Sequence, residues 1–319
     1  MVLHKIISEI KSCSKIGISF HMSPDGDSIG SSLALMIALR SLNKNAYIVS
    51  MEKVPENLNF LPFSNEIDGK HDNIEDDTDL VIIVDCGDIK RVNAQIDMET
   101  RNYRLLVIDH HMTNEMFGDF NFVDVKAAAA AELIYKIIVE LGIVLNKNIA
   151  ECLYSSIITD TGSFKHSSTS ATTHMIAAKL ISTGINFSAI HRKLFENIKY
   201  QKLRLYGLVF NTMKLVDNKI CILKITNAML KENGTDTCDT SDIISLGLQI
   251  DTAEVAVLLK ENNDGVKISL RSKEAVDVRK VAEKFGGGGH IRASGIYIEN
   301  VTMSDAEQLI INEIRKEII

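Results

Sequence analysis

Residues 15–30 read KIGISFHMSPDGDSIG, an apolar run that leads into a histidine and two aspartates, His21, Asp25 and Asp27. A continuous apolar run without strict alternation is typical of a strand buried on both faces. The SPDGDS segment is typical of a turn that leads into a helix. The stretch therefore predicts a buried strand that delivers polar side chains at its carboxyl end.

Two later runs end in the same way. LVIIV leads to Asp85, and LLVI leads to Asp109, His110 and His111. Helical patterns separate these runs, and such alternation predicts an α/β fold with a doubly wound parallel sheet. The carboxyl ends of parallel strands meet at one edge of the sheet, where open α/β folds bind their ligands. We therefore expect these side chains to share one cleft.

The length of 319 residues favours two domains, because one compact core rarely grows so large. The α/β pattern covers residues 1–185, and a helical stretch at 186–211 is expected to connect it to the rest. We expect helices over 170–184 and 187–214. Three further strand-like runs, the last two joined by an NNDG turn signal, predict a smaller α/β domain with a mixed sheet over 212–319.

Composition excludes several classes of protein. The chain has 45% hydrophobic and 24% charged residues, and it shows neither a signal-peptide pattern nor an apolar run of about 18 residues that could span a membrane. We therefore expect a cytoplasmic protein without a membrane partner. The formal net charge of −7 argues against binding to long duplex nucleic acid. No CxxC pair is present, so we expect reduced thiols at Cys13, Cys86, Cys152, Cys221 and Cys238.

A fourth segment, SSIITDTGSF, places Asp160 in a turn that can join the same cleft. Five ionised carboxylates in one cleft require cations or raised pKa values. Imidazole and carboxylate together suit Mn²⁺, with Mg²⁺, Fe²⁺, Co²⁺ or Zn²⁺ as alternatives. Taken alone, an Asp-x-Asp before a helix is more often an N-cap than a ligand. Three strands that all end in Asp or His argue against that simpler reading for the whole set.

The run KFGGGGH places Gly286, Gly287, Gly288 and Gly289 before His290. Four glycines can form a flexible linker, but these lie between a helical pattern and a strand-like segment, inside a domain. Glycines at positive φ can present consecutive N–H groups to an anion. We expect this loop and the adjoining imidazole to bind phosphate or a nucleotide.

Together, HMSPDGDS, VDCGD, IDHHMTN and TDTGSF resemble the four motifs of the DHH phosphoesterase superfamily, and KFGGGGHIRASG with SLRS resembles its DHHA1 domain. The resemblance covers nearly the whole chain, and five motifs in this order are highly specific. Size and layout are similar to those of the bacterial nano-RNase and pAp phosphatase group. The resemblance implies an N-terminal DHH catalytic domain and a C-terminal DHHA1 domain that holds the substrate, where Arg271 in SLRS would bind a phosphate bidentately.

The same resemblance implies two Mn²⁺ ions with a shared ligand, as a two-metal clamp with ions about 3.5–4 Å apart requires. It gives His111 as the group that faces the phosphate and stabilises charge or protonates the leaving oxygen. It gives Asp109 as the carboxylate that accepts an N–H from a metal-bound histidine. The implied ligand sets are His21, Asp25 and Asp85 for one ion, and Asp27, Asp85, His110 and Asp160 for the other.

Two stretches depart from the usual pattern of that superfamily. Relatives often read SFRYSNT after the fourth motif, whereas this chain has SFKHSST, so Lys165 keeps a positive charge but lacks the geometry of arginine. The alanine run at 127–131 replaces a stretch that often carries hydroxyls. Neither change touches an expected metal ligand, and both bear on substrate preference.

The leading hypothesis is an Mn²⁺-dependent phosphohydrolase that degrades very short RNA oligonucleotides to mononucleotides and dephosphorylates 3′-phosphoadenosine 5′-phosphate (pAp) to AMP. Its expected partners are short oligoribonucleotides and pAp or related nucleotides, and we expect a monomer or homodimer.

Three alternatives stay open at this stage. One is a phosphodiesterase of cyclic dinucleotides or of linear pApA. A family II inorganic pyrophosphatase is less favoured, because that family uses a lysine and arginine cluster where this chain has GGGGH. The third is a non-catalytic nucleotide-binding or scaffold protein, which would be expected to have lost metal ligands, whereas none is missing here.

Overall fold

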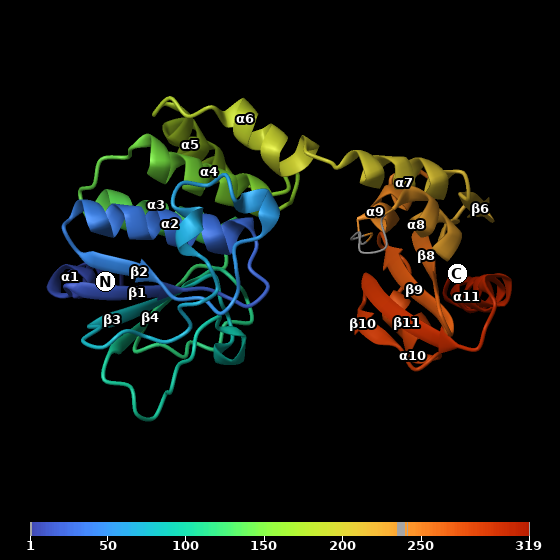
Figure 1. Cartoon of the computed structure of the whole chain (residues 1–319), viewed down its shortest axis with the longest axis horizontal. Coiled ribbons are helices and arrows are strands. Elements are labelled where there is room, and N and C mark those ends of the chain that lie inside the picture. Colours follow the sequence, from blue (N-terminus) through green and yellow to red (C-terminus); the bar gives the residue numbers. More distant parts are fainter. Residues whose placement is uncertain (1, 235–239, 241, 319) are drawn as a thin grey trace. The chain divides into compact units, whose positions relative to one another are not determined.

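The computed structural model describes residues 2–234, 240 and 242–318. The chain divides into two compact units, Met1–Asn197 and Ile198–Ile319, coloured blue to yellow-green and yellow to red in Figure 1. Among the described residues, no helix is long and apolar enough to cross a membrane. The four cysteines in these ranges are free and buried, and Cys238 lies outside them.

The described part of the first unit, residues 2–197, contains a five-stranded sheet, six α-helices, three 3₁₀ turns and one π-helical turn. Its strands are β1 (Lys15–Ser19), β2 (Asn45–Ile48), β3 (Leu80–Val84), β4 (Arg104–Asp109) and β5 (Phe120–Val123). Its helices are α1 (Val2–Ser12), α2 (Gly26–Ser41), α3 (Ala130–Glu140), α4 (Lys147–Asp160), α5 (Ala171–Ile181) and α6 (Phe187–His191). Its short turns are η1 (Glu56–Leu58), η2 (Ser64–Glu66), η3 (Ile89–Arg91) and the π-helical η4 (Arg192–Glu196).

The first sheet has the strand order β2-β1-β3-β4-β5, and all its neighbouring strands are parallel. The predicted parallel α/β fold is therefore confirmed. The chain winds outward from β1 to β2 and then returns to place β3 on the other side of β1. This reversal of strand order creates a crevice at the carboxyl ends of β1 and β3.

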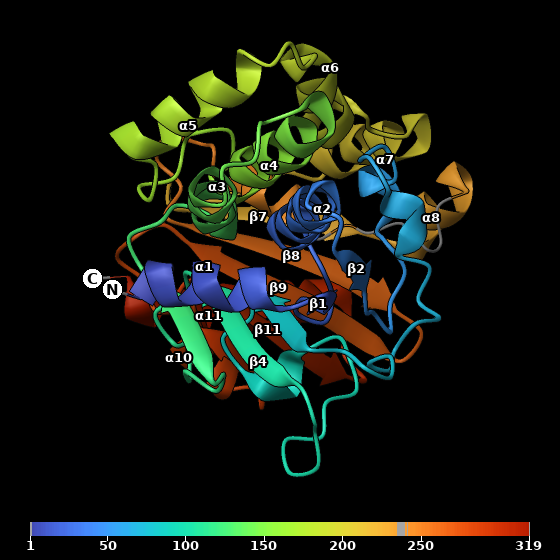
Figure 2. The same ribbon diagram turned by 90° about the vertical axis from the view of Figure 1, so that its left-hand side faces the viewer.

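Alternate side chains of each strand enter two different cores. Ile82 packs under the helices, which lie together on one side of the sheet in Figures 1 and 2, whereas its neighbour Ile83 packs on the opposite face. That second face is covered by side chains from loops, including Val49, Val92 and Phe117, rather than by long helices. Both faces are buried, which explains why the strands read as continuous apolar runs.

The second unit contains a six-stranded mixed sheet of order β10-β11-β9-β8-β7-β6, in which only β7 and β8 are parallel neighbours among the described pairs. This confirms the predicted mixed sheet, with its hairpin between β8 and β9. Its strands are β6 (Lys214–Val216), β7 (Ile220–Ile225), β8 (Val255–Asn262), β9 (Gly265–Ser272), β10 (Gly288–His290) and β11 (Ala293–Glu299). Its helices are α7 (Tyr200–Phe210), α8 (Asn227–Asn233), α9 (Ile243–Gly247), α10 (Val278–Glu283) and α11 (Met303–Glu317).

The two faces of the second sheet are covered to different extents. One face packs against α10 and α11 along most of the sheet, through residues such as Leu270 and Ile310. The core on the opposite face takes its strand residues from β7 and β8, and its helical residues from α7, α8 and α9. On that face the side chains of β9 and β11 alternate with buried ones and are exposed or half-buried. The second unit therefore presents an open strip of sheet over β9, β11 and β10.

Two elements differ from the sequence-based expectations. The single helix predicted over 187–214 is divided into α6, η4 and α7, because residues 195–201 are all exposed and offer no buried face that would stabilise a continuous helix. The edge strand β5 was not predicted, since its four residues are all only half-buried and show no long apolar run.

Candidate active site

The first loop of the site follows β1 and carries His21 and Asp25. Asp25 is the N-cap of α2, where its Oδ1 accepts hydrogen bonds from the backbone N–H groups of Asp27 and Ser28, both at 3.1 Å. The same oxygen lies 3.7 Å from Nε2 of His21. Nδ1 of His21 lies 2.9 Å from the carbonyl of Met22, and a proton on Nδ1 leaves Nε2 to face the carboxylates. Asp25 therefore both caps a helix and faces the cluster.

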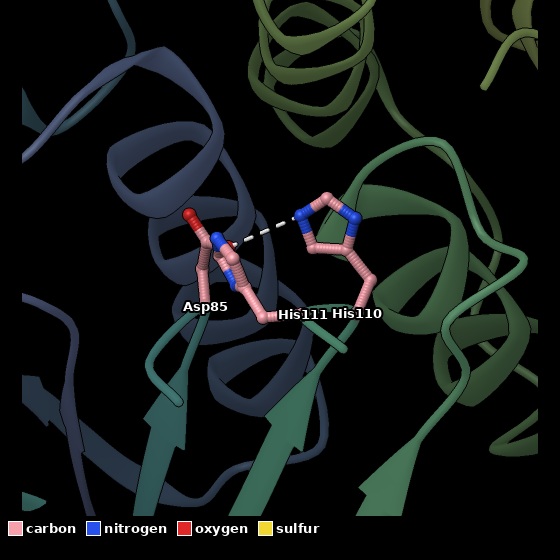
Figure 3. A group of neighbouring side chains, drawn as sticks. All are labelled: Asp85, His110 and His111. Carbon is pink, nitrogen blue, oxygen red and sulfur yellow. Dashed lines mark ion pairs between the residues drawn. The ribbon is translucent and has the colours of Figure 1, made fainter. Parts of the chain in front are cut away.

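Asp85 lies at the centre of the cluster, directly after β3 (Figure 3). It has a left-handed backbone with a φ of 58°, a conformation that Asp adopts more readily than most residues. Its Oδ2 lies 3.4 Å from Nε2 of His21, and its Oδ1 lies 3.4 Å from Nε2 of His110. Oδ1 is buried and has no hydrogen-bond partner among the described residues. A carboxylate whose two oxygens face two different imidazoles, and whose buried Oδ1 has no hydrogen-bond partner among the described residues, is an arrangement that a bound cation would complete.

A second group forms around His110, which follows β4. Its Nε2 lies 3.6 Å from Oδ2 of Asp27 and 3.6 Å from Oδ2 of Asp160, and its Nδ1 lies 3.2 Å from the carbonyl of Ala127. Asp27 is almost fully buried in the first turn of α2. Its carboxylate accepts hydrogen bonds from two N–H groups at the start of α3, including that of Ala130 at 2.6 Å, and from the hydroxyl of Ser156 on α4. These contacts fix the carboxylate toward His110.

Burial and charge act against each other on the pKa values of the cluster. Burial alone would lower the pKa of His21, but hydrogen bonding to its neighbouring carboxylates outweighs it and raises this pKa to about 10. The pKa of His110 is likewise raised to about 10 against the effect of burial, chiefly by Asp85. Burial, followed by repulsion from Asp85 and Asp160, raises the pKa of Asp27 well above its usual range. The cluster therefore carries more negative charge than it can hold without bound protons or cations.

Asp109, the last residue of β4, is fully buried and holds His111. Its Oδ1 lies 2.7 Å from Nδ1 of His111 and accepts the backbone N–H of His110 at 2.8 Å. Its Oδ2 accepts a hydrogen bond from the side-chain amide of Asn114 at 2.6 Å. Burial would raise the pKa of Asp109, but these hydrogen bonds lower it, so the group is a carboxylate. The hydrogen bond from Asp109 is also the main reason that the pKa of His111 is raised.

The partner of Asp109 differs from the expectation. The sequence motif predicts that Asp109 accepts an N–H from a metal-bound histidine. The ring that Asp109 contacts is that of His111, and the ring of His110, the proposed ligand, contacts the carbonyl of Ala127 instead. Nδ1 of His111 also lies 3.6 Å from Oδ1 of Asp85. Asp109 therefore orients the ring of His111, which Figure 3 shows beside Asp85.

The side chains named above fit divalent cations by chemistry and by position. Their ligand atoms gather within 4.8 Å of one another in overlapping sets, and oxygen with imidazole donors suits Mn²⁺ and similar metals. Asp85 belongs to two of the sets, as does His110. The sets are His21 with Asp25 and Asp85, Asp27 with His110 and Asp160, and Asp85 with His110 and His111.

Lys165 lies in the turn after α4, five residues beyond Asp160. Its side chain is exposed, and no ion pair involves it among the described residues. The turn is tight, because Gly162, Ser163 and Phe164 all have positive φ, between 54° and 66°. The lysine is thus presented on a strained turn adjoining the cluster but does not enter it.

In the second unit, Arg271 and His290 lie in one row across the open strip of sheet. Arg271 on β9 is opposite Ala293 on β11, and Ala293 is opposite His290 on β10. Residues directly opposite each other share a face, and two strand spacings separate Arg271 from His290 by about 10 Å. The small side chain of Ala293 leaves space between an arginine and an exposed histidine, which is suitable for an anion.

The glycine run is less open to an anion than the sequence suggests. Gly286 has a φ of 72°, and its N–H donates to the carbonyl of Glu283, while the N–H of Gly287 donates to the carbonyl of Ala282. These two bonds close the carboxyl end of α10 in the manner of a Schellman cap. Gly288 and Gly289 begin the edge strand β10. The first two glycines therefore terminate a helix, and the exposed part of the run is Gly288 to His290.

Comparison with known proteins identifies the family. The model of the DHH family, N-terminal domain, matches residues 15–157, and that of the DHHA1 domain matches residues 217–319. A bifunctional oligoribonuclease and PAP phosphatase NrnA of Thermus thermophilus is 31% identical over 95% of this chain and 90% of its own. The chain belongs to the DHH phosphoesterase family. This DHH protein is accordingly a hydrolytic phosphoesterase with a C-terminal DHHA1 domain.

Two further relatives agree with this assignment. The NrnA protein of Bacillus subtilis, which is named for the same two activities, is 30% identical over 87% of this chain and 87% of its own. The crystal structure of an exopolyphosphatase-related protein from Bacteroides fragilis matches the DHH protein with a TM-score of 0.82 and 28% identity, over 98% of this chain and 95% of that one. The fold of this chain is therefore shared with a solved structure over nearly its whole length.

Sequence reasoning missed two residues of this DHH site. Asn114 closes the IDHHMTN motif and holds Asp109, and its place in that motif was an available signal. Glu52, after β2, accepts hydrogen bonds from the N–H of Ser23 and from the amide of the buried Asn93. No pattern in the surrounding sequence marks Glu52, because its partner is 29 residues away.

Proposed function

We propose that the protein is an Mn²⁺-dependent phosphohydrolase that degrades very short RNA oligonucleotides to mononucleotides and dephosphorylates pAp to AMP. The main support is Asp85, whose two oxygens face His21 and His110 in separate groups of potential metal ligands. The activities named for the Thermus and Bacillus relatives favour these substrates.

The ligand assignment follows the two groups. His21, Asp25 and Asp85 would hold one ion, and Asp27, Asp85, His110 and Asp160 would hold the other. When bound, the ions supply Lewis-acid polarisation of phosphate oxygens and an activated water. The mixture of carboxylate and imidazole donors favours Mn²⁺, and Mg²⁺ or Co²⁺ are the alternatives to test.

His111 is proposed as the proton donor to the leaving oxygen. Its Nδ1 is engaged by Asp109, so its Nε2 is the atom available to a substrate. The carboxylate of Asp109 favours the protonated ring and fixes its orientation, as a general acid requires. Asp109 thus acts through His111 and not on the substrate.

Substrate binding is proposed for residues of both units. Arg271 would grip a phosphate through its planar fork, with His290 and the exposed backbone of Gly288 and Gly289 as further donors. Lys165 would add positive charge from the turn that follows Asp160. Few cationic groups are involved, which suits a short substrate better than a long one.

The test is Mn²⁺-dependent release of AMP from pApA and from pAp. The native protein should release AMP from both, and both Asp85→Asn and the double variant D109A/H110A should be inactive while retaining the native circular dichroism spectrum. Activity that persists in Asp85→Asn would overturn the metal assignment. Hydrolysis of cyclic di-AMP or pyrophosphate in preference to both substrates would overturn the substrate assignment.

A further inference from the structure

A pocket of about 380 Å³ adjoins the metal-ligand cluster within the first unit. Its size is in the lower part of the range of about 300–1,000 Å³ that is typical of small-molecule sites. Asp25, a proposed ligand of the first ion, forms part of its wall, and so does Thr159, which immediately precedes Asp160. A group attached to a phosphate at the cluster would therefore lie next to the entrance of this pocket.

The pocket is built from four segments that are distant in sequence. Pro24 comes from the loop before α2, Pro55 and Leu58 come from the η1 region, Thr159 comes from the end of α4, and Leu194 and Phe195 come from η4. Two of its lining residues, Gly26 and Thr159, pack closely together, because a Cβ on Gly26 would lie 2.4 Å from Oγ1 of Thr159. Phe195 is 38% exposed, so its ring is not part of the hydrophobic core.

The walls do not suit a phosphate, because none of the described residues that line the pocket is basic. Asp25 is the only ionisable residue among them, and it is already a proposed metal ligand. The other lining residues are mostly apolar, with an amide from Asn57 and a hydroxyl from Thr159. The amide of Asn57 has no hydrogen-bond partner within the described part of the chain. A neutral, flat group with polar edges matches these walls.

A nucleobase has these properties. Its faces stack on aromatic and apolar side chains, and its edge forms hydrogen bonds. The side-chain amide of asparagine can bond bidentately with the N6 and N7 edge of adenine. The η4 segment that forms part of the wall is π-helical, and π-helical turns often occur at functional sites.

We propose that this pocket binds the base of the nucleotide whose phosphate lies at the metal ligands, with Leu194 and Phe195 against its face and Asn57 at its edge, and that it favours adenine. This proposal rests on the proposed function and names a specificity site for it. Pro24 and Asp25 link the pocket to the cluster, so a base seated there would fix the position of its phosphate.

The experiment compares pApA with two analogues in which either the first or the second base is replaced by hydrogen. The native protein should lose activity on one analogue, which identifies the base that is read. Phe195→Ala should lower kcat/KM for pApA by about 5- to 100-fold, in line with the energy of base stacking, and should have no further effect on that analogue. Phe195→Tyr should restore activity, and Asn57→Ala should remove a preference for pApA over pCpC.

A matched control is Phe187→Ala, since Phe187 is 47% exposed on the neighbouring helix and does not line the pocket. Equal loss in Phe195→Ala on pApA and on the abasic analogues would overturn the base-binding role and indicate a structural one. Equal rates of the native protein on all three substrates would also overturn it. No hydrolysis of any of them by the native protein would instead contradict the proposed function, so the two failures are distinguishable.

Discussion

The carboxylate of Glu52 accepts a hydrogen bond from the backbone N–H of Ser23 at 2.6 Å, and the same oxygen accepts one from the amide of Asn93 at 3.0 Å. Ser23 has a φ of 56° and lies between His21 and Asp25. Glu52 therefore holds the strained loop that joins two proposed ligands of one ion.

Loss of this contact should weaken one metal site. Glu52→Asp keeps the charge but shortens the side chain, and we expect Mn²⁺ affinity at the first site to fall by about 10- to 100-fold, as for other supports of metal ligands. Glu52→Gln keeps an acceptor oxygen and should lose less. Calorimetric titration with Mn²⁺ measures both, and Lys53→Ala is the control on the same loop. Equal affinity in Glu52→Asp and the native protein would contradict this positioning role.

Metal binding should stabilise the fold through Asp85. An ion at about 100 times its dissociation constant adds about 2.7 kcal/mol per site, so Mn²⁺ should raise Tm by roughly 5–10 °C, and a chelator should reverse the shift. Asp85→Asn should remove it, because asparagine tolerates the left-handed backbone but binds a cation poorly. Asp88→Asn, in the same loop, should retain the shift. Thermal melts with and without Mn²⁺ make the comparison.

His111 should affect only leaving groups that need a proton. His111→Ala should lower kcat for pApA by about 10²- to 10⁴-fold, the usual contribution of a general acid. A p-nitrophenyl ester of a nucleotide should be affected far less, since its leaving group departs as an anion. Asp109→Asn should show the same selectivity with a smaller loss. Equal losses on both substrates would point to a general defect in the site, which Mn²⁺-dependent Tm would reveal.

Arg271 should act on binding rather than on the chemical step. Arg271→Lys keeps the charge but loses the bidentate fork, so KM for pApA should rise by about tenfold or more, with a smaller change in kcat. Lys267→Ala is the matched control, because Lys267 is exposed on the same strand and face. A rise in KM that is equal in both variants would contradict a phosphate grip that is specific to Arg271.

The strand-end residues could be predicted from sequence because their position follows from topology. Asp85, Asp109 and His110 each come at the end of an apolar run. In a parallel sheet, residues at the carboxyl ends of the strands all lie at the same edge. The chemistry of a crowded set of carboxylates then predicts a cation. Neither step requires side-chain rotamers, and the parallel sheet on which both depend is observed.

Features that depend on side-chain direction or on distant partners could not be predicted. The ring that Asp109 contacts depends on rotamers, which are invisible in a sequence pattern. The use of Gly286 as a helix cap depends on where α10 ends, and helix ends are set within one or two residues by local hydrogen bonds. Neither Glu52 nor the neighbouring Lys53 belongs to a recognisable sequence motif. The supporting role of Glu52 becomes visible only in the fold, where the backbone N–H of Ser23 approaches its carboxylate.

In the second unit, Glu307 should link stability to pH. Its carboxylate, on α11, contacts Lys224 of β7 at 2.5 Å and Lys214 of β6 at 3.0 Å. Burial would raise the pKa of Glu307, but the two lysines outweigh it and lower this pKa below its ordinary value of 4.5. A folded-state pKa that is lowered adds stability above the unfolded-state pKa, and this stability is lost as the pH falls through the folded-state value.

Glu307→Gln should therefore be less stable than the native protein near neutral pH, by roughly 1 kcal/mol for a pair whose lysines are partly exposed. The difference should shrink as the pH falls below about 4.5, where the native carboxylate also becomes neutral. Calorimetric unfolding of the full chain across this range measures it. Glu283→Gln, which removes a carboxylate that is 58% exposed, is the control and should change little. A difference that stays constant with pH would mean that Glu307 acts through packing rather than through its charge.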